Sequence, residues 1–97
     1  MESKGRLFEI LAKIKAKPAM YIGHPSISDL FVFLTGYKTA RRELEIRPND
    51  RELTFYENFH EFIQDRYQIH NSNSWAKIIM LNCPDENQGF DRFFELL

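Results

Sequence analysis

The sequence predicts an all-α fold, a compact single-domain bundle of about five helices. In most of the longer segments, apolar residues recur at intervals of three, four and seven, which is the spacing of an amphipathic helix. The four prolines fall between these segments, where one helix ends and the next begins. A chain of 97 residues is the size of one small domain, so we expect residues 1–97 to share one core.

The composition is typical of a soluble globular protein with an aromatic core. Hydrophobic residues make up 43% and charged residues 28%, and nine Phe, four Tyr and one Trp supply large rings. Each buried ring removes roughly 150–250 Å² from water, so a few rings contribute much of a small core. No apolar run approaches the length of a membrane span, and the N-terminus is too polar for a secretory signal. With a single Cys, these features predict a cytoplasmic protein without disulfides.

The first helix is predicted over residues 6–17 from an apolar stripe at helical spacing. The stripe consists of Leu7, Ile10, Leu11 and Ile14. Basic residues at the Lys13–Lys17 end suit the negative end of the helix dipole. The next stretch, 18–25, is bracketed by two prolines and contains three large side chains in a row, too few for a helix. We therefore predict a buried crossover at 18–25, in which Gly23 adopts a backbone conformation that a β-carbon would oppose.

A second helix is predicted over about 27–45, with Ser26 or Ser28 as its N-cap. Its apolar positions are Ile27, Leu30, Phe31, Leu34, Tyr37 and Leu44. Gly36 lies in the middle of this helix, where glycine costs about 1 kcal/mol relative to alanine. We therefore expect Gly36 to allow another element, the crossover at 18–25, to approach closely.

A third helix is predicted over about 52–68, after a turn at 47–50. Its apolar face contains Phe55, Phe59, Phe62, Ile63 and Tyr67, with Tyr56 at the edge. The opposite side carries Glu57, Glu61 and Asp65, whose spacing of four aligns them in a row. Like charges at this spacing destabilise a helix slightly. We interpret the row as a surface for a cationic partner.

The remaining residues predict two shorter helices. Residues 75–83 follow a good N-cap, Ser74, and contain a β-branched apolar run that suits either a helix or a buried strand. Because no second strand is available to pair with it, we predict a short buried helix. The last helix is predicted from its apolar residues Phe90, Phe93, Phe94 and Leu97, with Asp85 and Glu86 at its N-terminal end, where negative charge is favourable.

No pattern of catalytic or metal-binding residues emerges, so we predict that the protein is not an enzyme and needs no cofactor or metal. The three histidines lack the spacing of a metal-binding helix, and Cys83 follows an apolar run typical of a small buried residue. Arg66 and His70 resemble the Arg-x-x-x-x-His signature of HEPN-type ribonucleases, but their spacing is one residue short. Residues 17–23 resemble a segment of gyrase-type ATPase domains, whose glycine-rich ATP-binding elements are absent here.

Charge is unevenly divided along the chain, although the net charge is only −1. Residues 1–42 contain eight Lys or Arg against three Asp or Glu, whereas residues 43–97 contain five against eleven. Such a division is typical either of a protein that steers a charged macromolecular partner or of an ordinary solvated surface. The basic Lys13–Lys17 end leaves a second class open, a small helical nucleic-acid-associated or regulatory protein.

Five motifs follow one another over most of the chain. They are Pro-x-Met-Tyr-Ile-Gly at 18–23, Phe-Leu-x-Gly-Tyr at 33–37, Phe59 with Phe62-Ile63, Ser-Trp-Ala-Lys-Ile-Ile at 74–79 and Phe-Asp-x-Phe-Phe-Glu-Leu-Leu at 90–97. This order resembles a family of small bacterial proteins from polymorphic toxin loci, whose members look like immunity proteins. Ala19 stands where the family more often has Gly, and Ser74 precedes the Trp where Gly is usual. Both differences affect backbone freedom rather than chemistry.

The resemblance implies that the protein binds and neutralises a cognate toxin domain, such as one from a contact-dependent growth-inhibition system. Toxins that attack nucleic acids are usually basic around their active sites because they hold phosphates, so carboxylates suit their inhibitor. We expect a monomer that forms a one-to-one complex with a basic nuclease and has no membrane or nucleic-acid partner. The predicted partner-binding residues are Glu57, Glu61 and Asp65 first, Asp85 and Glu86 second, and Tyr56 as an aromatic anchor.

Overall fold

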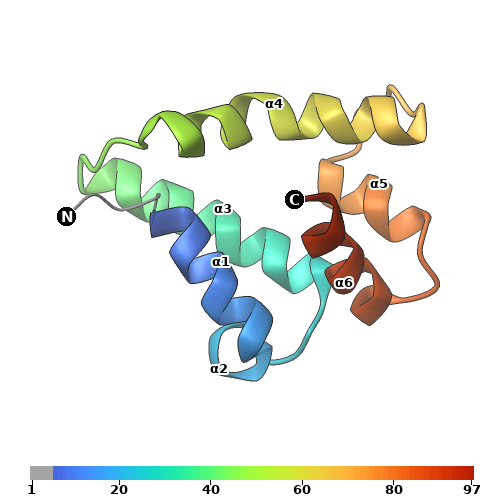
Figure 1. Cartoon of the computed structure of the whole chain (residues 1–97), viewed down its shortest axis with the longest axis horizontal. Coiled ribbons are helices and arrows are strands. Elements are labelled where there is room, and N and C mark those ends of the chain that lie inside the picture. Colours follow the sequence, from blue (N-terminus) through green and yellow to red (C-terminus); the bar gives the residue numbers. More distant parts are fainter. Residues whose placement is uncertain (1–5) are drawn as a thin grey trace.

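The computed structural model describes residues 6–97, which form six helices and no strand (Figure 1). The helices are α1 (Arg6–Ala16), α2 (Pro18–Ile22), α3 (Ile27–Glu43), α4 (Asp50–Tyr67), α5 (Trp75–Leu81) and α6 (Glu86–Leu96). The predicted all-α fold is therefore confirmed, and the ambiguous segment at 75–83 contains a helix. The prediction that the N-terminus is no secretory signal concerns a segment whose first five residues lie outside the described range. None of the six helices is long and apolar enough to cross a membrane.

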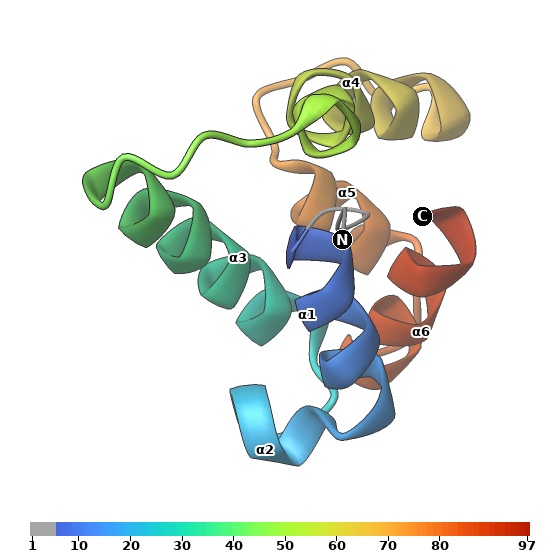
Figure 2. The ribbon, with the colours of Figure 1, turned by 60° about the vertical axis from the view of Figure 1, so that its left-hand side comes forward.

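Helix α4 lies along one side of the molecule, and α2 lies at the opposite side in both views (Figures 1 and 2). Helix α4 packs mainly on α5, while α6 packs on both α3 and α5. Figure 2 shows that α3 starts near α6 and diverges from α5 and α6 as it runs to its C-terminal end. Residues 44–49 then lead back to α4. The C-terminal half of α3 and the N-terminal half of α4 therefore face one another outside the main core.

The core collects apolar side chains from every described helix except α2. Its buried members are Leu7, Leu11, Ile14, Ile27, Leu30, Leu34, Phe59, Ile63, Ala76, Ile78, Ile79, Phe90 and Phe93. Trp75 joins the aromatic part of this core, with its ring centroid 5.0 Å from Phe93, 5.2 Å from Phe31 and 5.3 Å from Phe59. Rings at these distances attract one another in addition to the area they bury.

Local capping side chains determine where the helices begin. Ser26, Ser74 and Asp85 each accept a hydrogen bond from the backbone N–H three residues later, as N-cap residues do. Helix α4 begins two residues earlier than predicted, because Asn49 and Glu52 form a capping box. The Glu52 N–H donates to Asn49 Oδ1 and the Asn49 N–H donates to Glu52 Oε1, both at 2.9 Å.

The segment at 18–25, predicted as a buried crossover, is instead a short helix at the surface followed by a turn. Pro18 occupies the first helical position of α2, where its missing N–H costs nothing. No residue of α2 is buried, and Met20 is 69% exposed. The prediction was wrong because three apolar residues in one turn point in different directions, so only part of the turn contacts the core. Gly23 has φ = 89°, which confirms that it adopts a conformation unfavourable for a β-carbon.

The close approach predicted at Gly36 occurs at Gly89 instead. Gly36 is exposed, and a β-carbon there would meet nothing within 4 Å. At Gly89 in α6, a β-carbon would lie 2.8 Å from Cγ2 of Ile27, the first residue of α3. The prediction was wrong because helical periodicity locates a glycine within its own helix but does not identify the helix packed against it.

Replacing the two glycines by alanine is expected to have opposite effects. We expect Gly89→Ala to lower the free energy of unfolding by about 1–3 kcal/mol, because Ile27 is buried and its β-branched side chain is stiff. Gly36→Ala is the matched control, and we expect it to raise the free energy of unfolding by about 0.5–1 kcal/mol through better helix propensity. Urea unfolding followed by circular dichroism measures both changes. Similar stabilities for the two variants would contradict the close packing at Gly89.

Candidate interaction surface

A buried carboxylate holds the N-terminal end of α4 in place. Glu52 is only 1% exposed. Its Oε2 accepts hydrogen bonds from Arg41 Nη1 at 2.7 Å and from the Leu7 backbone N–H at 2.8 Å, while Oε1 accepts from Asn49. These partners belong to α3, α1 and the loop before α4, so one side chain joins three parts of the chain. This role was not predicted from the sequence, in which Glu52 resembles any acidic residue in a first helical turn.

Hydrogen bonding keeps this buried pair ionised. Burial by itself raises the pKa of Glu52, but the bonds from Arg41, Leu7 and Asn49 outweigh burial and hold the pKa below its ordinary value. The hydrogen bond to Glu52 in turn raises the pKa of the Arg41 guanidinium. A charged pair therefore fixes the angle between α3 and α4 at neutral pH.

The three predicted carboxylates of α4 form one row on its solvent face, which we call the acidic ridge (Glu57, Glu61 and Asp65). All three are exposed, and buried Phe59 faces the core from the other side of the helix. Within residues 6–97, Glu57 and Glu61 have no hydrogen-bond or ion-pair partner, and Asp65 Oδ1 lies 3.7 Å from Nε2 of exposed His70. The ridge therefore presents largely uncompensated negative charge to solvent.

Two apolar side chains flank the ridge, and an aromatic ring lies beside it. Leu53 and Phe62 are 40% and 47% exposed, although the sequence placed Phe62 on the buried face. Tyr56, the predicted anchor, is half-buried, with Lys38 Nζ 4.6 Å from its ring centroid. Burial raises the pKa of the Tyr56 hydroxyl. Lys38 thus already contacts the Tyr56 ring, while Leu53 and Phe62 offer apolar area to solvent.

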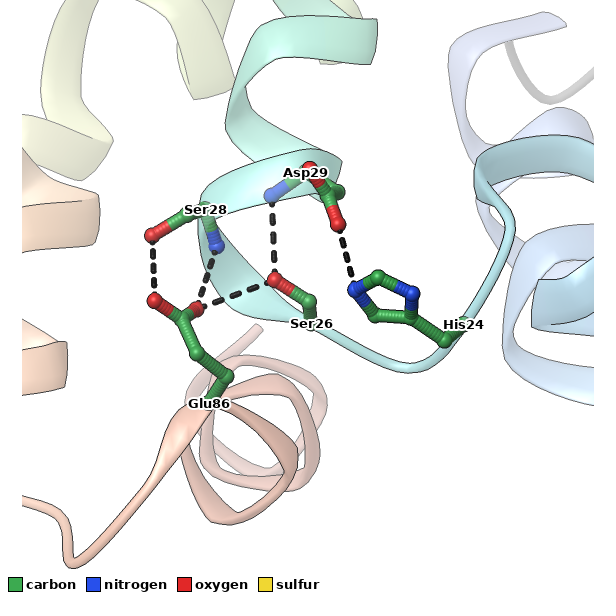
Figure 3. A network of polar contacts seen from close by, with 5 residues as sticks. All are labelled: His24, Ser26, Ser28, Asp29 and Glu86. Atoms are coloured by element: carbon green, nitrogen blue, oxygen red, sulfur yellow. Dashed lines mark hydrogen bonds and ion pairs between the residues drawn. The ribbon is translucent and has the colours of Figure 1, made fainter.

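The second predicted pair, Asp85 and Glu86, has a structural role where α6 meets α3 (Figure 3). Asp85 caps α6 through its hydrogen bond from the backbone of Gln88. Glu86 Oε1 accepts from the Ser28 N–H at 2.9 Å and from the Ser26 hydroxyl at 3.0 Å, and Oε2 accepts from the Ser28 hydroxyl at 2.8 Å. Both oxygens of Glu86 are therefore already bonded within the chain, which makes this carboxylate less available to a partner than those of the acidic ridge.

The Glu86 contacts predict a dependence of stability on pH. Burial raises the pKa of Glu86, but the bonds from Ser28 and Ser26 outweigh burial and lower the pKa below its ordinary value of 4.5. A carboxyl group with a lower pKa in the folded state stabilises the protein above its unfolded pKa and loses this effect as pH falls through the folded pKa. We therefore expect the free energy of unfolding to decrease below about pH 4.5.

Urea unfolding at a series of pH values measures this decrease. Glu86→Gln is expected to make the acid loss of stability shallower, because one of the responsible carboxylates is gone. Glu61→Gln, at an exposed position without a partner in the described chain, is the matched control and should keep the wild-type pH profile. A wild-type profile in Glu86→Gln would contradict the role of this carboxylate.

The histidines and the cysteine lie apart from one another. His24 Nε2 contacts Asp29 Oδ2 at 2.7 Å, His60 is a half-buried residue of α4, and His70 lies in the loop after α4. Cys83 is a free, half-buried thiol. In the described part of the chain, no three His, Cys, Asp or Glu side chains gather to hold a metal ion.

A groove between α3 and α4 was not predicted, and we call it the α3–α4 groove. Its outer part has a volume of about 620 Å³ and is lined by Lys38, Arg41, Arg42, Glu45, Ile46, Arg47, Pro48, Leu53, Tyr56 and Glu57. An inner part of about 360 Å³ shares Lys38, Arg42 and Tyr56 with the outer part and reaches Trp75. The spacing of Lys38 and Arg42 predicts a basic strip on one helix, but only the tertiary structure places α4 opposite that strip.

Together these features define a small all-α protein whose main surface features are an acidic ridge and a basic groove beside it. Comparisons of the chain with protein-family models, with curated proteins and with solved structures found no match. Its function is therefore inferred from the chemistry of its own surface.

Proposed function

We propose that the protein is an immunity-type inhibitor that binds a cognate toxin domain, a basic nuclease, one to one and neutralises it. The acidic ridge is the observation that carries this proposal. Three carboxylates lie exposed in a row on one helix, and two of them have no partner among residues 6–97.

The repulsion within the ridge favours a state in which a cationic partner is bound over the free protein. Like charges four residues apart cost a helix about 0.2–0.5 kcal/mol per pair, and a bound cationic surface relieves this repulsion. The flanking Leu53 and Phe62 supply exposed apolar area, which protein interfaces need at their centres. The ridge thus combines exposed charge with apolar area along both of its edges.

A nuclease toxin would meet these requirements. Its active site must hold phosphates and therefore carries Lys and Arg, for which the carboxylates of Glu57, Glu61 and Asp65 are suitable competitors. Opposite charges also speed the encounter of the two proteins. A fast encounter matters because the inhibitor must bind the nuclease before the nuclease cleaves nucleic acid in the cell. Binding of this kind requires no catalytic group in the inhibitor.

The proposal is tested with the product of the neighbouring gene. Co-expression, pull-down and calorimetry are expected to show a one-to-one complex, and the protein is expected to protect cells that express the toxin. An unrelated basic nuclease serves as the control and should neither bind nor be inhibited. If the neighbouring gene encodes no toxin, or cells are not protected, the proposal fails.

The exposed lysines at and just beyond the C-terminal end of α1 support a second class of function. Lys13 and Lys15 lie in the last turn of α1, and Lys17 follows it directly before α2. Figure 1 shows that this end of α1 lies on the side of the molecule opposite α4. Exposed basic clusters attract the phosphates of nucleic acids. A salt-dependent mobility shift of RNA or DNA, lost in a variant with these lysines changed to Glu, would favour a nucleic-acid-associated protein over an inhibitor.

A further inference from the structure

The α3–α4 groove carries the opposite charge to the ridge beside it. Its cations are Lys38, Arg41, Arg42 and Arg47, and its carboxylates are Glu45 and Glu57. Arg41 is paired with Glu52. Arg42 and Arg47 are exposed, and neither guanidinium has a hydrogen-bond or ion-pair partner in the part of the chain that the structure describes. The end of α3 and the loop after it therefore bring unpaired positive charge to the groove.

Apolar surface lies next to this charge. At the outer part of the groove, Ile46 and Leu53 are 44% and 40% exposed. The inner part is lined by several aromatic rings, including Phe31, Phe59 and half-buried Trp75. An occupant that satisfies both kinds of surface must carry carboxylates and apolar side chains together.

The distribution of charge around the groove favours a protein segment over a nucleic acid as its occupant. A nucleic-acid backbone carries phosphates at regular short intervals. Such a backbone would meet Glu57, which lines the groove, and Glu61 one turn further along α4. A peptide segment can instead place its carboxylates near Arg42 and Arg47 and its apolar side chains near Ile46 and Leu53.

We propose that the α3–α4 groove is a second binding site, which takes an acidic and partly apolar segment of a partner protein. Carboxylates of the segment pair with Arg42 and Arg47, where planar guanidinium groups bind them through two hydrogen bonds. Its apolar side chains pack against Ile46 and Leu53. This site borders the acidic ridge, because Leu53 and Glu57 line the groove, but its cations come from the end of α3 and the loop after it.

Trp75 provides a direct test, because it is the only Trp in the chain and lines the inner part of the groove. The probe is a synthetic peptide that alternates Glu with Leu and Phe, titrated into the full-length protein. We expect a saturable change in Trp emission that weakens as salt rises. The same peptide with Lys in place of Glu is expected to cause no change.

Variants assign the binding to the groove. Arg42→Glu combined with Arg47→Glu is expected to weaken peptide binding at least about tenfold. Lys13→Glu combined with Arg66→Glu is the matched control, because it changes net charge equally at exposed positions away from the groove. Circular dichroism checks that both variants fold.

Each other outcome overturns the inference. Absence of saturable binding, or equal weakening in both double variants, removes the peptide site. Binding of oligothymidylate in place of the peptide assigns the groove to nucleic acid. An emission change on diluting the protein alone assigns the groove to a second copy of the chain.

Discussion

Glu52→Ala is expected to lower the free energy of unfolding by about 3–5 kcal/mol, because it removes one partner of a buried ion pair. The substitution leaves the Arg41 guanidinium, only 13% exposed, without its carboxylate. It also leaves the backbone N–H groups of Leu7 and Asn49 without acceptors. A domain of this size has a total stability of about 5–15 kcal/mol, so the loss is a large part of the whole.

Urea unfolding at neutral pH measures this effect. Glu57→Ala is the matched control, since it removes an exposed carboxylate from the same helix and is expected to change stability by less than about 0.5 kcal/mol. Replacing Arg41 and Glu52 together by Met is expected to recover part of the loss, because no charge then remains buried without a partner. Equal stabilities for Glu52→Ala and Glu57→Ala would contradict the structural role of the pair.

Reversing the charge of the acidic ridge is expected to weaken toxin binding by well over tenfold. The variant changes Glu57, Glu61 and Asp65 to Lys, and its fold should persist because all three side chains are exposed. Repulsion between the new lysines and a cationic partner slows association and removes the paired charges of the complex. Surface plasmon resonance at several salt concentrations measures both the rate and the affinity.

A second triple variant separates the position of the charges from their number. Glu9, Glu43 and Asp91 are exposed carboxylates outside α4, and changing them to Lys alters the net charge equally. This control is expected to bind with nearly wild-type affinity and to lose only part of the long-range attraction. If the ridge variant binds as well as wild type, the interface lies elsewhere on the protein.

The acidic ridge was predictable because it lies within one helix. Once α4 forms, Glu57, Glu61 and Asp65 must share a face, whatever the rest of the chain does. The other predicted pair, Asp85 and Glu86, shows what a local pattern does not contain. The position of Glu86 at a helix start is a local property, but its hydrogen bonds reach Ser28, which lies 58 residues earlier in the chain.

The sequence by itself determined the helical class, the five helices that correspond to α1, α3, α4, α5 and α6, the cap at Ser74 and the choice of Ser26 or Ser28 as the cap of α3. These features depend on residues three or four positions apart, which interact as soon as one helical turn forms. Gly23 belongs to the same group, because its positive φ is required by the turn that follows Ile22.

Only the tertiary structure decided which residues became buried and which surfaces came together. Glu52 is buried because its partners Leu7 and Arg41, 45 and 11 residues away, converge on it. Position 89 requires a glycine because Ile27 packs against it. The α3–α4 groove forms only when side chains from two helices come together. Such contacts depend on how helices are placed in space, and the periodicity of any single helix does not contain that information.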